Sequence, residues 1–307
     1  MSFEHEVLIY DGLDGFLAGV LPFLRDGLER EEPMMVAVSA ERIGALREAL
    51  GDAADAVQFV DMVELGRNPG RIIPAWREFL STNRRDGHPI RGIGEPVWAG
   101  RSDEELVECQ LHEALLNVAF ADAEGFRLLC PYDRSALDEA VVREACCMHP
   151  SIVDGRRRRR SPVYRNGDEL LAPFDAPLPP PRAPVEVLAY DRRSLDDLRS
   201  VVADRGAAAR LEASRAADLV LAVNEAAANS VRHGGGNGVL RMWEDDGALI
   251  CEVRDRGLVV DPLVGRRKPA PHQSGGWGVY IAHQVCDLVQ LRSDELGTVV
   301  RLYVRRV

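Results

Sequence analysis

Three polar residues are spaced along one predicted helix so that they share a face. Glu225, Asn229 and His233 recur at intervals of four in an alanine-rich segment, and therefore form one stripe. A carboxylate can take a proton from an attacking hydroxyl, and a carboxamide oxygen suits Mg²⁺ as a ligand. Phosphoryl transfer needs mainly positioning, charge neutralisation and one such carboxylate. A surface helix often carries a polar stripe without any function, so the spacing alone leaves both interpretations open.

Two glycine-containing segments follow this helix. Asp255-Arg256-Gly257 comes after a predicted strand, and Ser274-Gly275-Gly276-Trp277-Gly278 leads directly into an amphipathic helix. Glycine-rich backbone ahead of a helix exposes amide N–H groups at the positive end of the helix dipole, where phosphate binds. Each cluster alone is equally typical of a flexible loop. Both interpretations therefore remain open for each segment taken alone.

The basic residues limit the kind of nucleotide site that is compatible with the chain. Of the 38 lysines and arginines in 307 residues, Lys268 is the one lysine. A Walker A phosphate loop and Schiff-base chemistry both need a lysine at a defined place, so this composition nearly excludes both. Any nucleotide site must use other groups.

The distribution of charged and apolar residues restricts the kinds of partner and the compartment that we expect. Residues 1–150 contain 28 acidic residues and 14 arginines, a net charge of −14, which argues against nucleic-acid binding. No apolar run approaches the ~18 residues of a membrane-spanning helix, and the acidic first 30 residues are unlike a signal peptide. The six cysteines are scattered, which is typical of buried thiols in a reducing compartment. We expect a cytoplasmic protein that contacts neither nucleic acid nor membrane.

The first half alternates short apolar β-type runs with helical patterns. Strands are predicted at residues 7–10, 34–38, 57–60, 90–94 and 126–130, and helices near 13–29, 43–50, 72–83, 103–120 and 135–147. Helices of crossover length between strands predict an α/β domain with a mostly parallel sheet covered on both faces.

The second half follows a connector and has a different order. The arginine run 156–160 and six prolines between 173 and 184 predict an extended, stiff interdomain connector over 151–184. Strands are then predicted at 185–189, 239–243, 249–254, 288–291 and 298–304, and helices at 195–208, 214–233 and 279–287. Strands joined by short turns pair antiparallel and leave the helices on one face, which predicts an α+β two-layer sandwich.

The three polar and glycine-rich segments resemble the N, G1 and G2 boxes of the GHKL (Bergerat) ATPase superfamily, which uses no lysine phosphate loop. The E-x-x-x-N-x-x-x-H pattern, the short G1 segment and the strand Gly297-Thr298-Val299-Val300 are similar to those of the anti-sigma-factor serine/threonine kinases. This resemblance, which covers roughly residues 185–307, implies ATP and Mg²⁺ as cofactors.

The resemblance also implies roles for individual residues. Asn229 would bind the Mg²⁺ that bridges the phosphates, Glu225 would be the catalytic base, and Asp255 would accept a hydrogen bond from the adenine amino group. The other implied nucleotide-binding residues belong to the loop, the lid, the last strand and the helix end: Gly257, Gly275, Gly276, Gly278, Thr298 and His233. For His233, helix-end capping or packing is an equally good interpretation.

Four segments of the first half resemble the MEDS sensory domain, which accompanies such ATPase domains in actinobacterial regulators. They are His5–Tyr10, Gly94–Trp98, Cys109–Asn117 and Cys130–Asp133. The resemblance implies a RecA-like α/β sheet and a sensory role for an unknown ligand. Glu95 and His112 are polar groups in apolar surroundings, which suits a small-molecule site at strand ends.

A metal site is a second interpretation of this half. His5, Cys109, His112, Cys130 and His149 could converge, because Cys109 and His112 lie three residues apart on one helix face. Lone thiols and histidines on apolar helices are more often buried packing groups, so packing is favoured. The sensory candidates are His5, Glu95, Cys109 and His112.

These resemblances imply a two-domain regulator with a sensory domain (1–150), a connector (151–184) and a GHKL kinase domain (185–307). It would bind ATP and Mg²⁺, sequester a sigma factor and phosphorylate serine or threonine of an anti-anti-sigma (STAS) partner. Relatives of the ATPase half often dimerise, so a homodimer is compatible with this interpretation. The alternatives are an ATP-dependent binding module without kinase activity and a histidine-kinase-like signalling protein.

Overall fold

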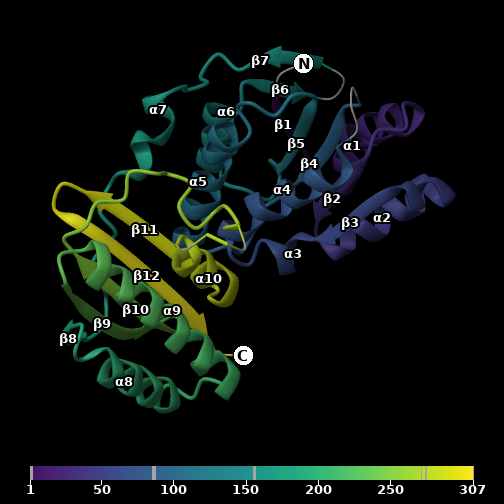
Figure 1. Ribbon diagram of the computed structural model, residues 1–307. Helices are drawn as coiled ribbons and strands as arrows, with labels where there is room; N and C mark the ends of the chain where they lie inside the picture. Colours follow the sequence, from purple (N-terminus) through teal and green to yellow (C-terminus); the bar gives the residue numbers. More distant parts are fainter. Residues whose placement is uncertain (1–2, 85–87, 155–156, 271, 274, 307) are drawn as a thin grey trace. The chain divides into compact units, whose positions relative to one another are not determined.

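The protein divides into two compact units, residues 1–172 and 173–307, each with its own sheet (Figure 1). The computed structural model describes residues 3–84, 88–154, 157–270, 272–273 and 275–306. No helix in these ranges is both long and apolar enough to cross a membrane.

The first unit is built on a seven-stranded sheet with the order β3-β2-β4-β5-β1-β6-β7. All neighbouring strands pair parallel except β6 and β7, which pair antiparallel. The strands are β1 (Glu4–Tyr10), β2 (Met34–Val38), β3 (Val57–Asp61), β4 (Ile90–Gly94), β5 (Phe126–Asp133), β6 (Ser151–Asp154) and β7 (Arg157–Arg160). Every residue of β2 is buried, as expected of a central parallel strand between two helical layers.

Helices cover both faces of this sheet. The helices are α1 (Gly12–Glu29), α2 (Ala40–Leu50), α3 (Met62–Leu65), α4 (Ile72–Asn83), α5 (Asp103–Ala119), α6 (Glu139–Met148) and α7 (Asp168–Leu171). Ile93 of β4 packs in the same core cluster as buried residues of α1 and α2. A Cβ on the preceding Gly92 would lie 2.8 Å from the Trp76 ring of α4. Because successive strand residues face opposite sides, α4 lies on the face opposite α1 and α2.

Local sequence signals set where these helices begin. The Ser102 hydroxyl accepts a hydrogen bond from Glu105 N–H, and the Glu105 carboxylate accepts one from Ser102 N–H, which forms a capping box at the start of α5. Ser39 caps α2 through the N–H of Arg42. The predicted α/β class is confirmed, with all five predicted strands and the helices between them present.

The structure differs from the predicted connector over its first residues. Residues 151–154 form β6, which pairs parallel with β1, and residues 157–160 form β7. Within the arginine run, Arg158 pairs with Glu4 (2.9 Å) and with the buried Glu6 (2.5 Å) of β1. These ion pairs and the buried Ile152 explain why this part of the chain continues the sheet. The boundary between the two units lies between residues 172 and 173, in the second half of the predicted connector.

The second unit has an antiparallel five-stranded sheet with the order β11-β12-β10-β9-β8. Its strands are β8 (Glu186–Asp191), β9 (Asn237–Asp245), β10 (Ala248–Asp255), β11 (Leu288–Asp294) and β12 (Gly297–Arg305), and its helices are α8 (Leu195–Ala208), α9 (Ala213–His233) and α10 (Trp277–Val285). One core cluster joins residues of all three helices to the sheet, and Figure 1 shows the helices along one face. The predicted α+β two-layer sandwich is confirmed.

The tight turn between β9 and β10 shows how the sequence sets strand pairing. Asp246 (φ 44°) and Gly247 (φ 72°) both have positive φ, as a two-residue type I′ hairpin requires. Asp245 and Ala248 therefore pair across the turn, and the register continues to Val239 and Arg254. This register carries β10 to its last residue, Asp255, at the edge of the site described next.

Candidate functional site

The second unit contains a cavity of about 420 Å³ between α9, the start of α10 and one end of the sheet. Its polar or glycine lining includes Asn229, His233, Asp255, Gly257, Gly276, Gly278 and Thr298. Apolar side chains from the loop after β10 and from β11, β12 and α10 complete the wall: Leu258, Val259, Val260, Val264, Val279, Leu291 and Val300. A few polar groups in an apolar wall are typical of a small-molecule site.

The Asp255 carboxylate is held in place by two hydrogen bonds. Its Oδ1 accepts from the N–H of Gly257 (2.7 Å), and its Oδ2 accepts from the hydroxyl of Ser230 (2.5 Å). A Cβ on Gly234, just after α9, would lie 2.3 Å from Asp255 Cγ. The chain must therefore lack a side chain at Gly234 for α9 to approach the end of β10.

A chain of hydrogen bonds fixes the loop after β10 to the sheet. Val259 N–H donates to Ser293 Oγ (2.9 Å), Ser293 and Thr298 share a hydroxyl hydrogen bond (2.8 Å), and the Thr298 hydroxyl donates to Gly257 O (2.9 Å). Each hydroxyl thus serves as both donor and acceptor, and such chains strengthen cooperatively. Thr298 also lies directly opposite Asp255 in the pairing of β10 with β12.

The helix α10 begins over the polar stripe of α9. Gly276 has φ 83°, a left-handed conformation that suits glycine, and it is the residue before the first turn of α10. A Cβ on Gly278 would lie 2.8 Å from Asn229 Nδ2 and 3.1 Å from Glu225 Oε2. Both polar side chains are therefore next to the amino end of α10, where the helix dipole favours negative charge.

A second polar group lies at the carboxyl ends of three parallel strands in the first unit. The Tyr10 hydroxyl donates to Glu95 Oε1 (2.6 Å), and Arg42 of α2 donates to Glu95 Oε2 (2.8 Å) and to Asp133 Oδ2 (3.5 Å). Burial raises the pKa of the Glu95 carboxyl to about 7, although the Arg42 charge opposes that change. Glu95 can therefore hold or release a proton near neutral pH.

Each of the two units matches the model of a known domain family. Residues 4–150 match the model described as MEDS, MEthanogen/methylotroph, DcmR Sensory domain, and residues 188–304 match the histidine kinase-like ATPase domain. The chain joins a MEDS domain to a histidine kinase-like ATPase domain.

A solved structure also matches part of the chain. A crystal structure of the RsbU and RsbW domains of Rv1364c from Mycobacterium tuberculosis is 22% identical over 40% of this chain, with a TM-score of 0.31. The match spans about a third (32%) of that chain. No curated protein matches this one.

The ATPase domain brings most of the predicted nucleotide residues to one cavity. Asn229, His233, Asp255, Gly257, Gly276, Gly278 and Thr298 line it. Glu225 is half-buried next to Gly278 but outside the cavity wall, and Gly275 comes directly before Gly276 without lining the wall. His233 is exposed at the end of α9. Ser274 lies outside the described residues.

Sequence reasoning missed two hydroxyl residues of this site. Ser230 and Ser293 hold the Asp255 carboxylate and the loop after β10, respectively. Ser230 is fully buried, and its position directly after Asn229 is the signal in the sequence that could have indicated it. Ser293 comes from a strand far along the chain and has no such signal.

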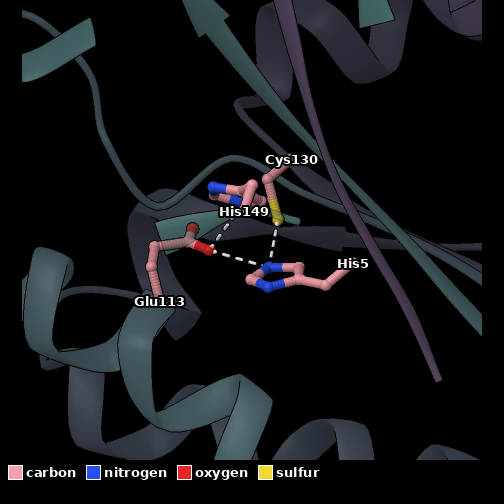
Figure 2. A group of neighbouring side chains, drawn as sticks. All are labelled: His5, Glu113, Cys130 and His149. Carbon is pink, nitrogen blue, oxygen red and sulfur yellow. Dashed lines mark hydrogen bonds and ion pairs between the residues drawn. The ribbon is translucent and has the colours of Figure 1, made fainter. Parts of the chain in front are cut away.

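The MEDS domain separates the predicted sensory candidates into different places. Glu95 belongs to the group at the strand ends, whereas the buried Cys109 thiol donates to Pro96 O (3.4 Å). Burial raises the pKa of Cys109 to about 12. His112 is buried on the same helix. His5 instead lies with three other buried side chains, those of Glu113, Cys130 and His149, as Figure 2 shows.

Proposed function

We propose that this protein is an anti-sigma regulatory factor. In this proposal the ATPase domain binds ATP with Mg²⁺, sequesters a sigma factor and phosphorylates a serine or threonine of an anti-anti-sigma (STAS) partner. The MEDS domain would control that activity in response to a signal. The kinase and its partners are proposed from the motif resemblance together with the geometry of the cavity.

The observation that carries the proposal is the arrangement around one cavity. Asn229, Asp255 and the glycine backbone before α10 line the same space, although they come from three separate segments. The cavity has apolar walls, which suit a purine base, and a fixed carboxylate in Asp255, which suits an exocyclic amino group. The amino end of α10, whose first N–H groups have no acceptor within the helix, suits a phosphate.

Two residues of the polar stripe on α9 would bind the metal ion and accept the proton. Asn229 would hold Mg²⁺ through its carboxamide oxygen, and the bound Mg²⁺ supplies charge neutralisation for the phosphates. Glu225 lies one helical turn before Asn229 and would accept the proton of the attacking hydroxyl. The half-buried position of Glu225 leaves it open to a substrate side chain from outside the cavity.

Nucleotide binding is tested first, by calorimetric titration of the full chain with ADP and ATP in the presence of Mg²⁺. We expect saturable binding of one nucleotide per chain. The absence of heat at millimolar nucleotide would remove the basis for the whole proposal.

Kinase activity is tested separately with radiolabelled ATP and a STAS protein captured by the full chain from its native lysate. Glu225→Gln should keep nucleotide binding and lose transfer of label. Glu212→Gln is the matched control, because Glu212 is exposed at the start of the same helix and has no side-chain capping hydrogen bond.

The chemistry of the product separates the alternatives. Acid-stable phosphate on the partner supports a serine/threonine kinase, and acid-labile phosphate supports a histidine-kinase-like protein. Nucleotide-dependent capture of the partner without any transfer of label supports a binding module.

A further inference from the structure

Four buried side chains of the MEDS domain point at one another from separate elements (Figure 2). His5 belongs to β1, Cys130 to β5 and Glu113 to α5, and His149 is the residue that ends α6. One nitrogen, sulfur or oxygen atom from each lies within 4.8 Å of the other three. The exposed fraction of each residue is 2% or less.

The hydrogen bond of His149 fixes which of its ring nitrogens carries a proton. Its Nδ1 lies 2.7 Å from the carbonyl oxygen of Ala145, which can only accept. Nδ1 must therefore be protonated, so Nε2 of the neutral ring presents a lone pair. That Nε2 lies 3.2 Å from Glu113 Oε2.

The His5 ring has the same arrangement. Asn117 Nδ2 donates to the carbonyl oxygen of Met148 (2.9 Å), which leaves Asn117 Oδ1 facing His5 Nδ1 (3.2 Å) as an acceptor. Nδ1 of His5 therefore carries the proton, and its Nε2 also presents a lone pair. That Nε2 lies 3.1 Å from Glu113 Oε2 and 3.4 Å from Cys130 Sγ.

When both rings are neutral, the lone pairs of two imidazole nitrogens therefore face one carboxylate oxygen among fully buried residues. Two imidazole nitrogens converge on one carboxylate oxygen, and the other oxygen, Glu113 Oε1, makes no hydrogen bond to any residue in the described ranges. A cation between these atoms would satisfy all of them.

We propose that the MEDS domain binds one divalent cation of the zinc class through His5 Nε2, His149 Nε2, Glu113 Oε2 and Cys130 Sγ. Zn²⁺ ligated at about 2.0–2.3 Å in a tetrahedron separates its ligand atoms by about 3.3–3.6 Å. The three separations given above, 3.1, 3.2 and 3.4 Å, are close to these edges. Small side-chain movements would complete the coordination.

The charges of the four ligands favour the same metal class. Two neutral imidazoles, one carboxylate and one thiolate carry two negative charges, which a divalent cation cancels inside the protein. Binding replaces the thiol proton of Cys130, and that proton leaves to solvent. The sulfur and imidazole ligands favour zinc over magnesium or calcium.

The residues behind the imidazoles match the surroundings of known metal sites. Metal-binding histidines usually donate their second N–H to a carbonyl or carboxylate, which fixes the ring. Ala145 O and Asn117 Oδ1 take these positions here. With four protein ligands and no open position, the site would tie α5 and the end of α6 to β1 and β5.

The test uses the full chain, freed of any affinity tag. Metal analysis of the purified protein should give about one zinc per chain. After chelation, titration with Co²⁺ should produce the visible absorption of a tetrahedral site and a sulfur-to-cobalt charge-transfer band.

Variants assign the ligands. Cys130→Ser should lose the charge-transfer band, whereas Cys109→Ser should keep it, since Cys109 is an equally buried thiol that contacts Pro96 instead. Asn117→Ala removes the partner of His5 and should weaken metal affinity by about 10–100-fold.

The wild-type titration remains decisive even where a variant does not fold. A stripped wild-type chain that gives only the weak spectrum of octahedral aqueous Co²⁺ would overturn the proposal. Loss of the charge-transfer band in Cys109→Ser, with its retention in Cys130→Ser, would overturn the assignment of the thiol.

Discussion

Replacing Asp255 by asparagine isolates one hydrogen bond of the proposed nucleotide site. Asparagine keeps the oxygen that accepts from Gly257 N–H, and its amide nitrogen can donate to Ser230 Oγ. The Ser230 hydroxyl can then donate to Ala226 O, which is 3.2 Å away. The local structure should survive, and only the negative acceptor for the adenine amino group is lost.

The expected effect follows from the strength of hydrogen bonds to charged groups. Such a bond contributes about 1.5–3 kcal/mol, and each ~1.4 kcal/mol changes an equilibrium constant tenfold. Asp255→Asn should therefore weaken ATP binding by about 10–100-fold. The discrimination between ATP and GTP should fall by a similar factor, because the lost contact is to the base.

Calorimetric titration of both nucleotides with the full chain measures this change. Asp261→Asn is the matched control, because Asp261 also lines the cavity and also accepts a hydrogen bond from the N–H two residues on, that of Leu263 (3.0 Å). The control should bind ATP like the wild type. If Asp255→Asn binds ATP within twofold of the wild type, or if Asp261→Asn loses as much affinity, adenine recognition by Asp255 is refuted.

Three further perturbations test other parts of the structure. Gly278→Ala puts a Cβ 2.8 Å from Asn229 Nδ2, and this overpacking should cost about 1–3 kcal/mol of nucleotide binding energy in the same titration. Unchanged affinity would contradict the proposed nucleotide site between Asn229 and the start of α10. Glu252→Gln leaves the buried Arg301 without its carboxylate (2.6 Å) and should lower the free energy of unfolding by about 3–5 kcal/mol in urea denaturation, so a loss below about 1 kcal/mol argues against a stabilising pair. Burial raises the pKa of Glu95 from its ordinary value of 4.5 to about 7, so the folded protein keeps a proton that the unfolded chain releases, and this group destabilises the fold as pH rises from about 4.5 to 7. Glu95→Gln should therefore gain about 3 kcal/mol relative to the wild type over that interval in melts followed by circular dichroism, and a difference that is independent of pH would exclude a raised pKa.

Periodicity and turn chemistry predicted most of the secondary structure. The buried strand Met34–Val38 and the helix Leu195–Ala208 lie at the predicted residues, because apolar runs and glycine turns are local signals. The strand Arg157–Arg160 could not be predicted in this way, since four arginines have no apolar face. Arg158 of this strand pairs with Glu4 and Glu6, which lie more than 150 residues earlier in the chain.

The same distinction holds for the two candidate sites. Glu225 and Asn229 lie on one helix, so spacing alone predicted that they share a face. The buried cluster in the MEDS domain depends on strand order, which places His5 beside Cys130 although 125 residues separate them. The spacing on α5 indicated Cys109 and His112 as candidate metal ligands, whereas in the structure it is Glu113 of this helix that faces His5. One residue of helical rotation decided which side chain joins the cluster.

The strand β7 also affects how separate molecules meet at high concentration. It is the last strand of its sheet, and an open edge is a template on which another extended chain can add. All four of its side chains are exposed arginines. Two such edges approaching each other would bring guanidinium groups into opposition, which disfavours pairing. The arginine strand should thus keep neighbouring molecules from fusing their sheets, and so protect the protein against aggregation through this edge.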